Sequence, residues 1–557
     1  MTKRTERKAR PTVDVPGRNV VIDARGYVYY YTRARWDKER KRGSDDRVCI
    51  GKLADPPDRS RMVPNGRYYE LFPELELPPS CSEELSVGGY LAVRGALETV
   101  GALGALRSAF PDLWAKVLSL AVYACCEESL VSYRMAQFCF RSFAGRARPL
   151  SAPQISELYA QIGEDREGCY AFLRAFGAGY ASWAGEAAPG ASGRRAVGFD
   201  STNCGTAAAG IPIAEWGHAK GDGGLPVVGT AYWVDEGTGI PVWYEQFAGS
   251  LIDRAECGFA FAEGSRCGLG SVFLMVDRGY FSAGNVRRLS EGGSEFGASL
   301  PRTRLADELF GRCAGIKGSQ AASIEGSGAF GERVDGIEVG GRAGLFAYVF
   351  YDPETALVES AAIDAAIAAA RAQAEAMEYY SGKAAASLPR WVRVSKRSPG
   401  AKKSRCVVEV DAEYCQRQRD RAGMFAVVSN AEMSAAEMLA IVRGRDAPEK
   451  SFRRKKWGLD GDAPRVHGMA ALQGKGLVEF VANVAMSSLA YLAGDVIKKT
   501  PTRTVAEAMD HLQTCSVAKR GGRWVQRYAL TKFQKDVFGR VGIDCGKIES
   551  IFAEAYV

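Results

Sequence analysis

Hydrophobic and polar positions change their spacing several times along the chain, and each change predicts a different kind of element. Aromatic and β-branched runs separated by turn residues occupy positions 19–53, which predicts short strands. Between 85 and 186 the apolar residues recur at helical spacing. Residues 185–195 are mostly small, include Gly and Pro, and end in two arginines. This composition predicts a linker before a strand-rich block that begins at 196.

The strand-rich block contains two aspartates that follow apolar runs. The segment AVGFD reads as a strand ending on Asp200, and the buried-strand run SVFLMV at 271–276 is followed by Asp277. Between them, two apolar runs flank DEGTG, which predicts a hairpin. After Asp277, Ser282 can cap a helix that leads into the strand EFGASLP. The order of strand, hairpin, helix, strand, helix and strand predicts an α/β fold with an RNase H-like catalytic core.

A long interval follows Asp277 before the chain reaches a third acid, Glu449, in a basic helical segment. About 170 residues are too many for a loop in a compact domain. The interval holds Gly-rich strand candidates at 334–351, an Ala-rich helix and the strand pair CVVEV and GMFAVVSN. We interpret it as an inserted subdomain, or an elaborated strand layer, within the core.

These patterns predict a long insertion between the second and third acids, with helical regions before and after the core. The expected regions are a basic tail with a small β-rich part (1–80), a helical DNA-binding domain (81–190), the first part of the RNase H-like core (191–300), the insertion subdomain (301–430), the last part of the core with the glutamate helix (431–500) and a helical C-terminal region (501–557). Within 431–500, Ser434 and Glu437 form a capping-box pattern, and Asp446 suggests a second helix start.

Charge and composition narrow the class of protein. The 557-residue chain carries a formal net charge of +8, and its basic residues cluster at 3–10, 32–43, 390–405, 452–456 and 519–527. Such clusters fit phosphate contacts, although solvated loops also carry them. Fourteen cysteines without a C-x-x-C pair and only three histidines give no zinc pattern and favour reduced cytosolic thiols. The N-terminus lacks the apolar stretch of a signal peptide, and the apolar segment 477–497 contains polar residues, so we expect a cytoplasmic protein without a membrane span.

The three acids can be interpreted in two ways. Taken singly, an Asp after a strand is often a turn residue or cap, and a Glu in a basic helix is often half of a surface ion pair. Taken together, Asp200, Asp277 and Glu449 can hold two Mg²⁺ ions, which prefer oxygen ligands. Mutual repulsion of the acids is relieved by the cations, which predicts a site that is poorly formed without them.

The helix around Glu449 places four side chains on one face. Arg445, Glu449, Phe452 and Lys456 follow one another at helical spacing. One interpretation is an amphipathic helix with Phe452 in the core. The other is a face that presents an acid to metal and two cations to phosphate. In either case Arg453, Arg454 and Lys455 add to the positive field.

This segment resembles the signature of bacterial insertion-sequence DDE transposases of the branch marked by Tyr-x2-Arg-x3-Glu-x6-Lys. Arg445, Glu449 and Lys456 match at these spacings, whereas the tyrosine position holds Val442. The run VDRGYFSAGNVRRL resembles the family's Asp-Arg-Gly-Tyr/Phe segment before a helix, and further likenesses extend over most of 20–495.

The resemblance implies a function and a site. Asp200, Asp277 and Glu449 would be the metal-binding catalytic triad, with two Mg²⁺ ions for which Mn²⁺ can substitute. DNA would be contacted by Arg445 and Lys456 and, in the same basic run, by Arg453 and Lys455. The reaction would be hydrolysis at an element end followed by strand transfer into target DNA, by a homodimer on double-stranded DNA in the bacterial cytoplasm at the nucleoid. A catalytically silent, transposase-derived DNA-binding protein and an RNase H-like nuclease that cuts without joining remain alternatives.

Overall fold

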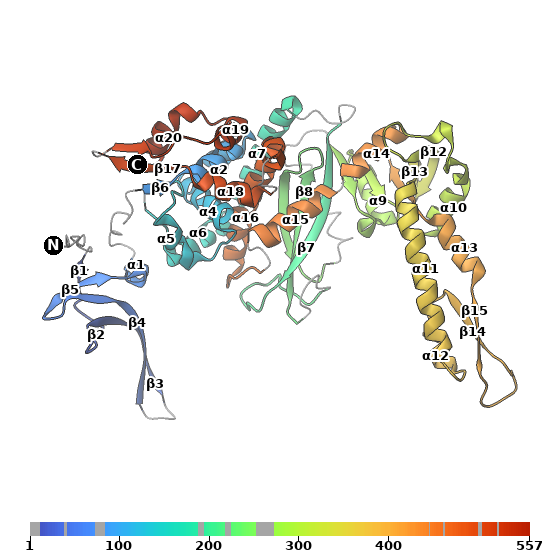
Figure 1. The fold of residues 1–557 in the computed structure, drawn as a ribbon, viewed down its shortest axis with the longest axis horizontal. Coiled ribbons are helices and arrows are strands. Elements are labelled where there is room, and N and C mark those ends of the chain that lie inside the picture. Colours follow the sequence, from blue (N-terminus) through green and yellow to red (C-terminus); the bar gives the residue numbers. More distant parts are fainter. Residues whose placement is uncertain are drawn as a thin grey trace, which may run out of the picture.

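The computed structural model gives a mixed α/β chain in which a helical region and a central sheet lie side by side (Figure 1). It describes residues 12–37, 42–72, 84–146, 148–187, 194–217, 224–251, 272–444, 446–459, 463–499, 504–520 and 523–556. The helix expected between the hairpin and the strand at 271–276 falls outside these residues.

The N-terminal region forms a small antiparallel sheet, and its aromatic and β-branched runs are strands, as predicted, although β3 and β4 are longer than the short strands expected. The strand order is β1–β5–β4–β3–β2, and Val28, Ile50 and Met62 are buried in its own small core. Its elements are β1 (Val13–Asp14), β2 (Val20–Ile22), β3 (Tyr27–Asp37), β4 (Arg42–Asp55), β5 (Asp58–Pro64) and α1 (Gly66–Leu71).

The helical region packs around one long helix from the C-terminal half of the chain. Helix α16 (Met469–Leu492) contacts α2, α4 and α6 on one side and strand β9 on the other. Gly163 and Gly474 allow α6 and α16 to approach closely, because a Cβ atom at either would meet the other helix's backbone. The helices before the sheet are α2 (Gly88–Thr99), α3 (Ala102–Ala109), α4 (Trp114–Glu127), α5 (Met135–Cys139), α6 (Ala152–Glu164) and α7 (Arg166–Ala187).

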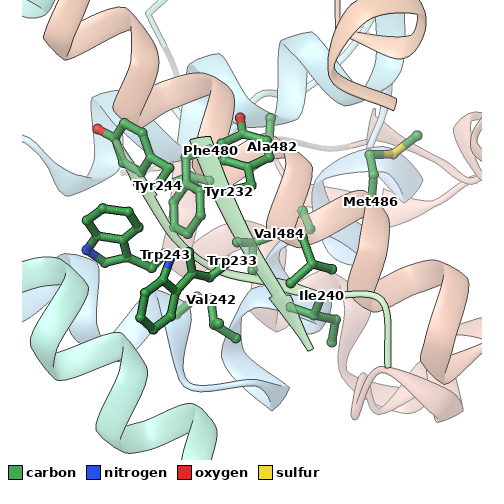
Figure 2. Close-up of a cluster of buried hydrophobic side chains, with 14 of the residues drawn as sticks. Tyr232, Trp233, Ile240, Val242, Trp243, Tyr244, Phe480, Ala482, Val484 and Met486 are labelled. Atoms are coloured by element: carbon green, nitrogen blue, oxygen red, sulfur yellow. The ribbon is translucent and has the colours of Figure 1, made fainter. Parts of the chain in front are cut away.

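Most of the apolar segment at 477–497 therefore lies in a core helix, α16, as its polar residues predict, and its last residues belong to the short helix α17 (Gly494–Lys499). Most of α16 is buried, and Phe480 stacks on Tyr244 of the sheet with ring centroids 4.8 Å apart (Figure 2). None of the described helices is long and apolar enough to cross a membrane.

The central sheet has eight strands in the order β12–β13–β16–β11–β10–β7–β8–β9. Strands β10 and β11 are parallel to β7, whereas β8 and β9 continue from β7 as an antiparallel meander. Every residue of β8 is buried, which requires cover on both faces. The strands are β7 (Ala196–Gly205), β8 (Val227–Asp235), β9 (Pro241–Ala248), β10 (Phe273–Val276), β11 (Glu295–Ser299), β12 (Phe330–Val339), β13 (Arg342–Tyr351) and β16 (Met424–Ser429).

The insertion contributes to this sheet and also extends away from it. Strands β12 and β13 form a hairpin, and β16 lies between β13 and β11. The prediction that CVVEV and GMFAVVSN pair with each other is wrong. The first segment is β15 (Cys406–Val410), which pairs with β14 (Val392–Lys396). The second segment contains β16, which pairs with β11 and β13. Helices α11 (Pro353–Glu375), α12 (Gly382–Ala386) and α13 (Ala412–Arg421) complete an arm, residues 353–421, that projects from the sheet (Figure 1).

The remaining helices frame the sheet and close the chain. Ser282 caps α9 and Ser434 forms the predicted capping box with Glu437 at the start of α14. At the C-terminus, β17 pairs with β18 and also with β6 (Glu84–Ser86), which precedes α2. The elements are α9 (Ala283–Glu291), α10 (Arg304–Arg312), α14 (Ala435–Gly444), α15 (Asp446–Gly458), α17 (Gly494–Lys499), α18 (Val505–Gln513), β17 (Ser516–Arg520), β18 (Arg523–Gln526), α19 (Lys532–Arg540) and α20 (Ile548–Tyr556).

Candidate active site

Two of the predicted acids lie side by side in the central sheet. Strands β7 and β10 are parallel neighbours, and their register pairs Phe199 with Val276. Asp200 is the next residue on β7, and Asp277 directly follows the end of β10, so the spacing of neighbouring strands implies that their backbones are about 5 Å apart. This places two carboxylates from distant parts of the sequence at the same level of the sheet.

The sequence predicts that Asp200 ends its strand, and this prediction is wrong. Strand β7 continues to Gly205, and Asp200 is paired with Tyr232 of β8. The polar residues after Asp200 stay extended because β8 supplies backbone hydrogen-bond partners along the whole segment. The site therefore lies in mid-strand for Asp200 and at a strand end for Asp277.

Tyr280 orients the Asp200 carboxylate. Its buried hydroxyl donates to Asp200 Oδ1 over 3.1 Å and lies 2.8 Å from Ser201 Oγ. The backbone N–H of Ser201 also donates to Asp200 Oδ1, at 2.8 Å. Sequence reasoning did not assign this role to Tyr280, although the residue belongs to the VDRGYF run, whose likeness to a known motif was the available signal.

Asp277 combines its position in the site with a local structural role. Its Oδ1 accepts from Arg278 N–H at 2.6 Å, which caps the single 3-10 turn Arg278–Tyr280. Asn285 donates to the carbonyl of Tyr280 at 2.8 Å and fixes the turn against α9. The turn thereby delivers Tyr280 to Asp200 from the strand end that carries Asp277.

Glu449 lies on a helix that crosses the sheet face above Asp200. Gly198 and Asp200 are two residues apart and share a face of β7. A Cβ atom at Gly198 would lie 2.9 Å from the Pro448 ring, so the helix start sits close above the strand. Farther along α15, Phe452 stacks on Tyr232 with centroids 4.8 Å apart and planes at 1°. Glu449, next to Pro448, is exposed to solvent.

A buried polar stripe on α16 anchors α15. Glu479 lies 3.4 Å from Lys455 Nζ and 3.6 Å from Lys475 Nζ, with each side chain at most 6% exposed. One turn further on, Asn483 donates to Ser451 Oγ at 2.9 Å. These contacts fix the rotation of α15 about its own axis, and hence the direction in which its acid points. The spacing of polar residues within an apolar helix was the sequence signal for this stripe.

The contacts of Lys455 do not fit the DNA-binding role predicted for it. Its ammonium is buried and paired with Glu479, so it cannot reach a phosphate. Burial lowers the pKa of Lys455, but Glu479 and the nearby Tyr232 and Cys204 raise it more, and the net direction is upward. The lysine therefore stays charged as part of the core.

Of the other predicted DNA contacts, one has a described side chain. Arg453 is exposed. Arg445 lies outside the described residues, as does the side chain of Lys456, whose backbone belongs to α15. Val442, at the tyrosine position of the signature, is half-buried against the apolar cluster under α14.

The fit of this site to divalent cations is partial. The oxygen-only donor set of Asp200 and Asp277 suits Mg²⁺. Within the described ranges, no three or more His, Cys, Asp or Glu side chains are grouped so that they could hold a metal ion. The fold thus brings together two of the predicted acids and places the third on the adjoining helix.

The chain is a mixed α/β protein with an aspartate pair in the middle of a mixed sheet. No protein-family model matches it, and no curated protein matches it. Among solved structures it is similar to the piggyBac transposase in a synaptic complex with hairpin DNA, with 11% sequence identity and a TM-score of 0.30 over 76% of this chain and 70% of that chain. A likeness at this level carries no argument about function.

Proposed function

We propose that this protein is a DDE transposase that cleaves DNA at element ends and transfers the strand into target DNA. The observation that carries the proposal is the register of Asp200 beside Asp277, with the Glu449 helix packed over the same strand. The match of Glu449 to the transposase signature, made from sequence alone, adds independent support.

The strand order supports an RNase H-like core for this enzyme. Strands β7, β8 and β9 form an antiparallel meander, and β10 and β11 add in parallel on the other side of β7. This is the order expected of an RNase H-like sheet, with β16, β13 and β12 as an extension. The proposed core thus continues into strands that the long insertion contributes.

In the proposed mechanism, the chain's acids hold and orient the reacting groups. Asp200 and Asp277 would hold two divalent cations together with Glu449, and α15 would bring Glu449 toward the pair. When bound, such cations activate the attacking hydroxyl and stabilise the leaving oxygen of an in-line displacement. Mutual repulsion of three carboxylates opposes their convergence until positive charge neutralises it, so the exposed Glu449 side chain would turn toward the pair only when cations are bound.

Tyr280 and the stripe on α16 would act as positioning groups. The Tyr280 hydroxyl fixes one oxygen of Asp200, which limits rotation of that carboxylate. The pairing of Lys455 with Glu479 holds α15 in one rotation. Both contacts reduce the reorganisation needed when the substrate phosphate arrives.

The test is cleavage and joining by the purified full chain. The protein is incubated with DNA that carries the ends of its own element, with Mg²⁺ or Mn²⁺. We expect nicking at the ends and joined products, both abolished in Asp200→Asn, Asp277→Asn and Glu449→Gln. Wild-type binding without cleavage would instead support a silent DNA-binding protein. Cutting without joining would support a nuclease, and full activity in all three variants would overturn the site.

A further inference from the structure

The arm ends in a basic tip that the proposed active site does not use. Helix α11 has 23 residues, so it spans about 34 Å at 1.5 Å per residue. Beyond it, the hairpin of β14 and β15 returns toward α13. The arm therefore reaches over a distance comparable to one turn of duplex DNA, about ten base pairs at 3.4 Å each.

The charge of the tip is strongly one-sided. Between Tyr379 and Val408 the chain has no Asp or Glu and eight cations, a number equal to the formal net charge of the whole protein. Seven of them are exposed and Lys396 is half-buried. One of these cations, Arg393, forms an ion pair with a carboxylate, that of Asp411. The ion pairs of the described residues include none for the other seven. The cations are Lys383, Arg390, Arg393, Lys396, Arg397, Lys402, Lys403 and Arg405.

The backbone of the tip is held by hydrogen bonds, and one lysine lies near each of its two tyrosine rings. Arg397 N–H donates to the carbonyl of Arg405 at 3.0 Å, which closes the hairpin loop. Lys403 Nζ lies 3.9 Å from the ring centre of Tyr379, and Lys396 Nζ lies 5.7 Å from that of Tyr380. The eight cations of the tip outnumber its two tyrosine rings, and each ring has a lysine over one face, so the tip favours phosphate contacts over single-strand stacking.

The base of the arm is fixed to the sheet. Glu359 pairs with Arg302 at 2.9 Å and accepts the Gly423 N–H at 3.0 Å. Strand β13 lies antiparallel to β16, which is antiparallel to β11, so β13 runs in the same direction as β7 and β10. The carboxyl end of β13, from which α11 starts, therefore lies on the same side of the sheet as the carboxyl end of β10, which Asp277 follows.

We propose that the arm tip binds the sugar-phosphate backbone of duplex DNA whose reacting end lies at the aspartate pair. This deepens the proposed function and rests on it for the identity of the polyanion. Four exposed cations of the hairpin loop, Arg397, Lys402, Lys403 and Arg405, supply the contact. Such contacts neutralise phosphates without reading base edges, so they hold the duplex independently of its sequence.

The test compares duplex binding by the full chain and by a variant in which these four residues are replaced by Ala. Binding to a labelled duplex is followed by fluorescence anisotropy at salt concentrations from about 50 to 200 mM. The plot of log K against log salt has a negative slope, and each lost phosphate contact makes it less steep by about 0.9. Loss of all four contacts should therefore reduce the steepness by up to about 3.6. A matched control replaces four exposed cations elsewhere, Arg342, Lys532, Lys535 and Lys547, and should retain the wild-type slope.

The outcomes separate this inference from the proposed function. Weaker duplex binding and a lower slope in the arm variant alone would support the arm contact, even if the wild type proved unable to cleave. An unchanged slope in the arm variant, with cleavage by the wild type intact, would overturn the arm contact and leave the proposed function standing. Lost binding to anionic vesicles or single-stranded RNA, with duplex binding unchanged, would also overturn it. Failure of the wild type to bind duplex DNA would overturn both.

Discussion

Replacing Glu479 with Ala probes the buried contacts that hold the candidate glutamate helix. In the structure this carboxylate lies between Lys455 on α15 and Lys475 on its own helix, at 3.4 and 3.6 Å. Each of the three side chains is at most 6% exposed, so water cannot replace the lost partner. Two ammonium groups would remain in the core without a counter-charge.

The expected loss follows from that burial. Breaking a buried ion pair by removing one partner costs about 3–5 kcal/mol, whereas an exposed pair contributes about 1 kcal/mol or less. Lys475 keeps a hydrogen bond to the carbonyl of Pro464 at 2.8 Å, which offsets part of the cost. We therefore expect Glu479→Ala to destabilise the protein by about 3 kcal/mol.

Urea denaturation followed by tryptophan fluorescence measures this loss as a shift of the unfolding midpoint. A second variant, Lys455→Met with Glu479→Leu and Lys475→Met, removes all three charges and should be more stable than Glu479→Ala, because no unpaired charge is left in the core. A loss below about 1 kcal/mol in Glu479→Ala would refute the reasoning, since it would mean that the network is hydrated.

Three further predictions concern local structure. Gly198→Ala should destabilise the protein by about 1–3 kcal/mol in urea, because the new methyl group meets the Pro448 ring at 2.9 Å; an unchanged midpoint would show that α15 is not seated there. Ser434→Ala should cost about 1 kcal/mol in the same assay through loss of the cap with Glu437, and Ser434→Thr should retain most of it. Burial raises the pKa of Asp235 above its unfolded value, so ionisation of its carboxyl group destabilises the folded protein as the pH rises. The variant Asp235→Asn should therefore gain stability relative to wild type between about pH 4 and 7 in the urea assay, and a stability difference that does not change with pH would contradict this.

Much of the fold follows from local patterns. Apolar runs on either side of turn residues were sufficient for the β8–β9 hairpin, and helix caps such as Ser282 were readable because they act within one turn. The pairing of β15 and β16 was mispredicted because strand neighbours are chosen by long-range packing, which adjacent sequence does not encode. Asp200 was placed at a strand end for the same reason, since β8 extends the ladder through polar residues.

The candidate site was predictable only in part. Asp277 follows a continuous apolar run that predicts a buried strand, and the residue before it, Val276, pairs with Phe199, the residue before Asp200. The burial of Lys455 was not predictable, because a basic run on a helix does not reveal which of its members faces the neighbouring helix. The partner of Lys455, Glu479, lies 24 positions later in an apolar segment, where only its unusual polarity indicated a contact.

Iron-mediated cleavage of the protein backbone tests most directly whether the three acids form one site. Ferrous ion replaces Mg²⁺ in the presence of DNA. Added hydrogen peroxide oxidises the bound ferrous ion to ferric ion and is itself split into hydroxide and a hydroxyl radical, which cuts the chain close to the metal. The account predicts cuts near Asp200, Asp277 and Glu449 that disappear together in the Asp200→Asn, Asp277→Asn double variant. Cuts near the two aspartates alone, or cuts that persist in the double variant, would contradict a shared three-carboxylate site.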